Sequence, residues 1–101
     1  MKNNYILVVS GEPKSIFLEI FFKALKHKKY KSPIILICNK NYLIRYIKKI
    51  NFKKKIKVLE LDKLNKYKLN NNCINLINIK FEKNNINKYI KESFELAFKL
   101  I

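Results

Sequence analysis

The sequence has little of several residue types on which common classes of protein depend. It contains one glycine, one histidine, one arginine and two cysteines among its 101 residues. The lone His27 and two cysteines outside any CxxC spacing give no ligand set for a zinc site. Lysine and asparagine interrupt every apolar stretch, so no run reaches the roughly 18 residues that suggest a membrane span. We therefore expect no membrane span, no signal peptide and a cytoplasmic protein.

Both cysteines lie in or beside apolar segments. Cys38 ends the run IILIC and Cys73 begins the run CINLINI. A thiol in such a setting usually behaves as a small buried hydrophobe, and it stays unpaired in a reducing compartment. The sequence thus predicts free cysteines, and a His27 that is solvated near the end of a helix.

An excess of positive charge is the most prominent feature of the composition. The formal net charge is +16, from 23 lysine and arginine residues against 7 acidic ones. A small basic α/β module that binds RNA or another polyanion is therefore one candidate function. Arg45 is the only arginine, however, and arginine is the residue that reads bases with two hydrogen bonds. Because the lysines are spread along nearly the whole chain, we interpret most of them as solvated surface and expect no specific nucleic-acid partner.

Apolar spacing in the first 61 residues alternates between strand and helix patterns. Continuous apolar runs at 5–9 and 34–38 are typical of strands buried on both faces. Apolar residues at intervals of three and four predict helices over 15–28, with Ser15 as N-cap, and over 41–50. A third short strand is expected over 56–61. The expected apolar faces comprise Ile16, Ile20, Phe21, Ala24 and Leu25 in the first helix and Leu43, Ile44, Ile47 and Ile50 in the second.

The rest of the chain predicts a loop, a strand and a helix. Residues 62–72 are rich in lysine and asparagine without a clear period, so we expect a loop there. The run at 73–79 predicts a fourth strand, and helical spacing predicts an amphipathic helix over 86–101. Its expected apolar face comprises Ile86, Tyr89, Ile90, Phe94, Ala97, Phe98 and Ile101. This order indicates a single partial α/β domain over 1–101, with a layered, mostly parallel sheet, flanking helices and right-handed crossovers.

One connection combines features of a binding site: it runs from Ser10 to Glu19, between the first strand and the first helix. In open α/β sheets ligands bind beyond the carboxyl ends of the strands, where a helix N-terminus offers free N–H groups to an anion. The alternative is that Gly11 and Pro13 only form a tight turn. The candidate cofactor-binding or cleft-lining residues are Gly11, Glu12, Pro13, Ser15 and Glu19. We do not interpret Glu12 and Glu19 as a catalytic pair, since Glu19 suits the first turn of a helix.

This connection resembles the signature Gly-Asp-Pro-Ala-Gly-Ile-Gly-Pro-Glu of the 4-hydroxythreonine-4-phosphate dehydrogenases. Gly11, Pro13, Ile16 and Glu19 match without a gap, and Glu12 keeps the acidic character. The flanks are also similar to the family, with an apolar strand before the turn and the helix EIFFKAL after it. The resemblance spans all 101 residues, which correspond to about a third of a family member.

The resemblance implies a cytoplasmic oxidoreductase of pyridoxal phosphate (pyridoxine) biosynthesis. Such an enzyme oxidises 4-phosphooxy-L-threonine with NAD, and decarboxylation of the product follows. A divalent metal, which is zinc, magnesium or cobalt, polarises the reacting oxygen. The implied fold is of the isocitrate and isopropylmalate dehydrogenase type, and the implied assembly is a homodimer. The metal ligands, the catalytic residues and most contacts to the phosphorylated substrate and NAD belong to later parts of a family member, so the resemblance places none in this chain.

The signature differs from the family at three positions. Ser15, Phe17 and Leu18 replace two glycines and a proline, and Phe17 adds bulk where a glycine allows close approach of a ligand. We expect the isolated chain to be inactive. The alternatives are the basic polyanion-binding module described above and a non-catalytic remnant of the enzyme.

Overall fold

A computed structural model describes residues 5–11, 16–81 and 85–101. The four strands are β1 Ile6–Val9, β2 Ile34–Cys38, β3 Ile56–Val58 and β4 Ile74–Asn78. The helices are α1 Phe17–His27, α2 Lys40–Ile50 and α3 Ile86–Leu100, and a 3-10 helix, η1, spans Leu61–Lys66. The chain is thus an α/β protein, as the alternation of patterns predicts.

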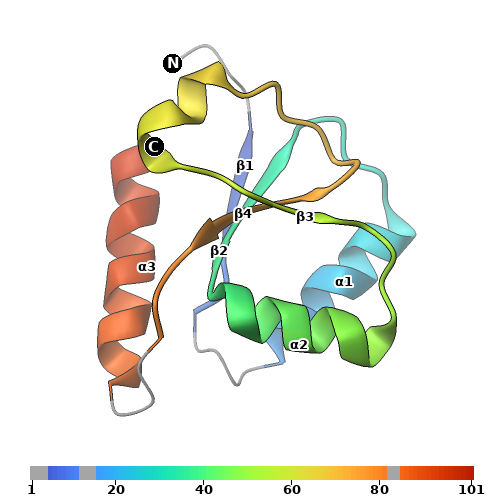
Figure 1. The fold of residues 1–101 in the computed structure, drawn as a ribbon, viewed down its shortest axis with the longest axis horizontal. Helices are drawn as coiled ribbons and strands as arrows, with labels where there is room; N and C mark the ends of the chain where they lie inside the picture. Colours follow the sequence, from blue (N-terminus) through green and yellow to red (C-terminus); the bar gives the residue numbers. More distant parts are fainter. Residues whose placement is uncertain (1–4, 12–15, 82–84) are drawn as a thin grey trace.

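The four strands form one sheet in the order β1-β2-β4-β3, and every neighbouring pair is parallel. The register sets Ile6 beside Ile34 and Leu36 beside Leu76. Helices α1 and α2 cover one face of the sheet, while α3 and η1 lie on the other (Figure 1). The expectation of a parallel sheet between helices is therefore confirmed.

Each face of the sheet carries its own hydrophobic core, and β2 contributes side chains to both cores. Leu36 and Cys38 pack with Leu18, Phe21 and Phe22 of α1 on one side. Alternate residues of β2, Ile35 and Ile37, pack on the other side with Ala97 of α3 and Leu64 of η1. A strand that is covered on both faces must be apolar at every position, which explains the uninterrupted run IILIC.

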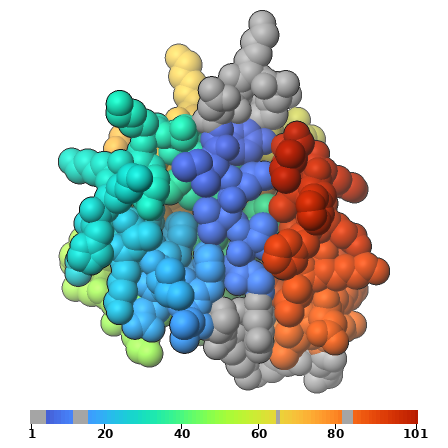
Figure 2. Space-filling model, turned by 180° about the vertical axis from the view of Figure 1, so that it is seen from behind, coloured from blue at the N-terminus to red at the C-terminus, as the bar shows by residue number. Residues whose placement is uncertain are grey.

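Strand β1 is less buried than its sequence predicts. It is the edge strand next to β2, and Ile6 is exposed while Leu7, Val8 and Val9 are half-buried. Figure 2 shows β1 at the surface, between α1 and α3. The prediction that this run is buried on both faces is therefore wrong, because composition does not distinguish a central strand from an edge strand.

The positions of the helices agree with the sequence better than their predicted faces do. In α1 the buried side chains are Leu18, Phe21 and Phe22, whereas Ile20 is exposed, as is Ile16, which precedes the helix at the N-cap position. The predicted N-cap, Ser15, lies outside the described residues. The sheet is covered by a narrow stripe of each helix, and the spacing rule selected a stripe rotated away from it in α1.

A similar shift occurs in α3, whereas α2 buries most of its predicted face, with Leu43 in the core and Ile47 packed against it. In α3 the buried residues are Tyr89, Ser93 and Ala97, while Phe94 and Phe98 are exposed. The predicted apolar face of α3 is thus only partly the buried one, because a small polar residue, Ser93, contacts the sheet side instead of a phenylalanine. In α2 only Leu43 is fully buried, and Ile50 is exposed.

Three further expectations have clear outcomes. Part of the predicted loop at 62–72 is helical, since η1 spans Leu61–Lys66. Cys38 and Cys73 are free thiols, and Cys38 is buried. His27 is exposed as the last residue of α1, as predicted. Within the described part of the chain, no helix is long and apolar enough to cross a membrane.

Candidate functional site

The connections that leave the carboxyl ends of β2 and β4 pass to opposite faces of the sheet. Strand β2 leads to α2 on one face, and its neighbour β4 leads to α3 on the other (Figure 1). In open α/β sheets a crevice forms where adjacent connections diverge in this way, and ligands bind there. The carboxyl ends of β1, β2 and β4 therefore border the candidate ligand crevice.

Gly11 follows β1 at this end of the sheet and has a left-handed backbone. Its φ is 68°, and a Cβ built on it would meet no atom within 4 Å. The turn therefore favours glycine because of its backbone conformation and not for lack of space. Among the other candidate residues from the sequence, Glu12, Pro13 and Ser15 lie outside the described residues.

Glu19, the fifth candidate, lies in the first turn of α1 and points away from the crevice. Its carboxylate pairs with the Lys23 ammonium at 3.2 Å, one helical turn later, and both side chains are more than half exposed. Glu19 lines a groove between α1 and α2, where its ion pair with Lys23 lies within α1 and not at the strand ends. An exposed pair of this type contributes little to stability.

The crevice itself is occupied by the side chain of Tyr89, which enters from α3. The Tyr89 hydroxyl accepts a hydrogen bond from the backbone N–H of Asn39 at 2.8 Å and lies 3.2 Å from the Ser10 hydroxyl. One phenol therefore joins α3 to the ends of both β1 and β2. The ring is covered by Phe81, whose centroid lies 5.5 Å away in an edge-on arrangement.

Asn39 is the second organising residue of the crevice. Its side-chain oxygen accepts a hydrogen bond from the N–H of Tyr42 and caps α2, while its amide nitrogen donates to the Ile79 carbonyl at 2.8 Å. Asn78, at the end of β4, accepts from the N–H of Lys40 at 2.8 Å. The two asparagines thus bind the start of α2 to the end of β4.

The groups inside this cluster are neutral. Burial is the main cause that raises the pKa of Tyr89 to about 12, although its hydrogen bond with Ser10 acts in the opposite direction. Burial also raises the pKa of the Cys38 thiol. At neutral pH the phenol and the thiol are therefore protonated, and the cluster provides hydrogen bonds and not an ionised nucleophile or base.

Space beside the cluster is small. A cavity of about 150 Å³ is lined by Tyr89 together with Lys80, Asn85, Lys88 and Glu92. Small-molecule sites usually measure roughly 300 to 1,000 Å³, so this cavity is too small for a dinucleotide. The described ranges also contain no group of three His, Cys, Asp or Glu side chains that could hold a metal ion. The described residues at the crevice therefore do not by themselves form a site for a dinucleotide or for a metal ion.

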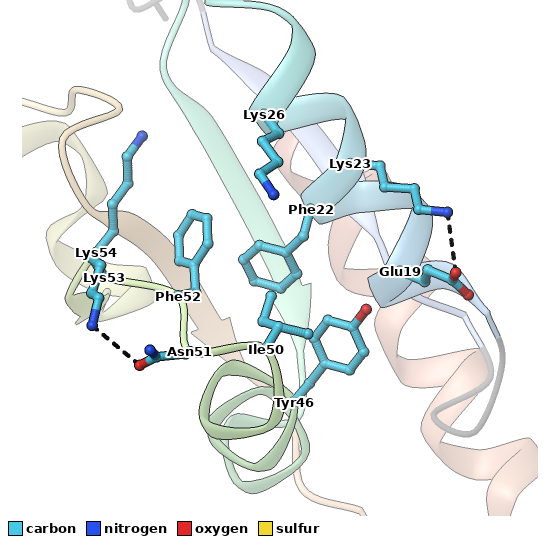
Figure 3. Close-up of a pocket in the computed structure, with 10 residues that line it drawn as sticks. All are labelled: Glu19, Phe22, Lys23, Lys26, Tyr46, Ile50, Asn51, Phe52, Lys53 and Lys54. Carbon is cyan, nitrogen blue, oxygen red and sulfur yellow. Dashed lines mark hydrogen bonds and ion pairs between the residues drawn. The ribbon is translucent and has the colours of Figure 1, made fainter.

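A larger groove lies away from the strand ends, between α1 and the carboxyl-terminal end of α2. This groove measures about 610 Å³. Its apolar floor contains Phe22 at the centre, stacked on Tyr46 at 5.6 Å and in edge contact with Phe52 at 4.7 Å between ring centroids. Ile50 completes the floor, as Figure 3 shows.

Charged residues surround the groove. Four lysines line it, which are Lys23, Lys26, Lys53 and Lys54, and Glu19 is the single acidic residue among the lining residues. Since Glu19 pairs with Lys23, the local charge is strongly positive over an aromatic floor. The arrangement can attract an anion whose body is apolar.

The sequence did not identify the residues that organise these two regions. Asn39 was detectable, because an asparagine between a buried strand and a helical pattern is a typical N-cap. Tyr89 gave no signal beyond its place on an apolar stripe, and the contacts of its hydroxyl depend on strands 50 or more residues away. The groove lies between α1 and the turn after α2. The periodicity of the sequence gives no sign that these two segments are neighbours.

Comparison with known proteins adds no assignment. No protein-family model matches the chain, and no curated protein sequence matches it at a significant level.

Proposed function

We propose that this chain provides the amino-terminal part of an NAD-dependent dehydrogenase similar to the 4-hydroxythreonine-4-phosphate dehydrogenases. In this proposal the fold is the first portion of an isopropylmalate dehydrogenase type of sheet. The carboxyl ends of β1, β2 and β4 form one wall of the substrate cleft, and the remaining walls come from other polypeptide.

The observation that carries the proposal is the backbone at Gly11. The matched signature begins at this residue, β1 leads into it, and α1 follows the connection. A φ of 68° gives a physical reason for glycine at the first position of the signature. The parallel sheet and the diverging connections at β2 and β4 support a ligand cleft at the same end.

The proposal requires the cofactor and the metal to be held mainly outside the described residues. The crevice is closed by Tyr89, and the adjoining cavity of about 150 Å³ does not accommodate NAD. The role left to this chain is to shape the cleft wall. Gly11 sets the course of the connection, while Asn39 and Tyr89 keep the strand ends in register.

Reconstitution of a divided enzyme tests this proposal. The full chain is purified together with a polypeptide that carries the later two-thirds of a 4-hydroxythreonine-4-phosphate dehydrogenase. The mixture receives 4-phosphooxy-L-threonine, NAD and a divalent metal, and NADH is measured by absorbance. We expect NADH from the mixture and none from either polypeptide alone.

Variants at Gly11 make the test specific. Gly11→Asn keeps a side chain that tolerates the left-handed conformation, whereas Gly11→Val does not. Activity of the mixture should therefore fall more with valine than with asparagine. A stable complex that produces no NADH would contradict the dehydrogenase proposal, and NADH from the chain alone would contradict the location of the catalytic residues.

A further inference from the structure

The groove between α1 and α2 has the size and lining of a small-molecule site, and it is separate from the cleft wall of the proposed dehydrogenase. Its volume of about 610 Å³ lies within the usual range for ligand pockets. Phe22 is almost fully buried beneath it, so the floor is a fixed part of the core. Ile50 at its border remains 39% exposed and offers apolar surface to a ligand.

The lysines around the groove differ in what they contact. The ammonium of Lys23 pairs with Glu19, that of Lys53 donates to the side chain of Asn51 at 3.2 Å, and that of Lys54 donates to the Asn71 carbonyl at 2.8 Å. Lys26 has no ion pair or hydrogen bond with any residue that the structure describes.

The position of Lys26 makes its ammonium available to a ligand. In Figure 3 its side chain points from α1 into the groove, toward the ring of Phe22. An ammonium beside an aromatic floor favours an anion directly above that floor, because the anion gains a charge partner while its body covers the rings. The Lys54 ammonium adds positive charge from the other wall of the groove.

We propose that the α1–α2 groove binds a planar aromatic anion, with its ring against Tyr46, Phe52 and Ile50 and its carboxylate or phosphate beside Lys26. An aromatic body is favoured over an alkyl chain because the partly exposed rings of Tyr46 and Phe52 flank the buried Phe22 in stacked and edge-on contacts. A neutral ligand would leave Lys26, Lys53 and Lys54 without a counter-charge from the groove, since Glu19 already pairs with Lys23.

Titration of the full chain with 2-naphthoate tests the proposal, with backbone amide signals followed by NMR. We expect shifts at Phe22, Lys26 and Phe52 and a Kd of about 1 mM, which is typical of a fragment-sized ligand. 2-Naphthalenemethanol, which has the same ring system without the charge, should bind about threefold or more weakly. Decanoate, an alkyl anion, should also bind more weakly.

Two variants separate the groove from the general positive charge of the protein. Lys26→Gln should weaken naphthoate binding about threefold, while Lys99→Gln, on α3, removes the same charge away from the groove and should leave binding unchanged. Ile50→Ser should weaken binding without affecting the fold, because Ile50 is partly exposed. Equal losses in the two lysine variants, shifts centred elsewhere, or tighter binding of decanoate would overturn the proposal.

Discussion

Two regions of this protein handle polar side chains in opposite ways. At the carboxyl ends of the strands, Ser10, Asn39 and Tyr89 are buried and hydrogen-bonded to one another or to backbone groups. In the α1–α2 groove, lysines stand in solvent around an apolar floor, and Lys26 contacts no acidic group among the described residues. The first region is closed and neutral, while the second is open and charged.

The difference follows from the cost of removing polar groups from water. A neutral hydroxyl or amide can be buried if each hydrogen bond is replaced, and the described buried side chains include no polar atom without a partner. An ammonium is far more costly to bury, so lysine stems cover apolar surface while their charges stay in water. We therefore expect stability to depend on the closed region and anion binding to depend on the open one.

The largest predicted effect belongs to Asn39 in the closed region. Asn39→Ala removes the N-cap of α2 and leaves the Ile79 carbonyl without its donor. Together these losses should lower the free energy of unfolding by about 3 kcal/mol, a large part of the stability of a small domain. Urea unfolding followed by circular dichroism measures the change.

Matched variants divide this effect into its parts. Asn39→Ser retains a capping oxygen and should recover about 1 kcal/mol of the loss. Asn85→Ala removes the N-cap of α3, where the side chain accepts one exposed hydrogen bond from Lys88, and should cost only about 1 kcal/mol. Equal losses of unfolding free energy in the two alanine variants would mean that the closed region contributes no more to stability than an exposed helix cap does.

The sequence predicts the elements of this fold because each one leaves a local signal. The apolar run of β2 and the helical spacing of α2 depend on neighbours within a few residues, and both elements appear where expected. The order β1-β2-β4-β3 leaves no such signal, since it depends on which strands pair across the chain. For that reason β1 was predicted as fully buried although it lies at an edge.

The sites were harder to predict than the fold. Gly11 could be identified because a single glycine after a strand indicates an unusual backbone, and its φ of 68° agrees. Tyr89 could not, because its hydroxyl bonds to Asn39 and Ser10 depend on the approach of α3 to two strand ends. Lys26 is one lysine among many in the sequence, and only the surrounding groove distinguishes it.

The second-largest predicted loss of stability, measured at neutral pH, belongs to Tyr89. Tyr89→Phe removes the acceptor of the buried Asn39 N–H and the partner of the Ser10 hydroxyl while it preserves the ring that contacts Phe81. An unpaired buried N–H costs about 1 to 3 kcal/mol, so we expect a loss of about 2 kcal/mol in urea unfolding. A variant as stable as the parent would show that water enters the crevice and replaces the phenol.

The same variant has a distinct dependence on pH. The pKa of Tyr89 is raised from 10.0 to about 12 in the folded protein, mainly by burial. Its contribution to stability is thus fully present below pH 10 and is lost as the pH rises from about 10 through 12, because the unfolded chain ionises first. The parent should therefore lose its advantage over Tyr89→Phe in this range, while the titration of lysines affects both proteins equally. A constant difference between the two would contradict the raised pKa.

The smallest predicted change in stability lies in the open region, at Glu19. Glu19→Gln breaks the exposed pair with Lys23 and should lower the free energy of unfolding by only about 0.3 kcal/mol. Binding of 2-naphthoate should increase about twofold, because the Lys23 ammonium loses its counter-charge beside the groove. Glu95→Gln is the matched control, since it breaks an equivalent exposed pair with Lys91 on α3 and should leave naphthoate binding unchanged. An equal gain in both variants would assign the binding to net charge, whereas a gain confined to Glu19→Gln locates it in the groove.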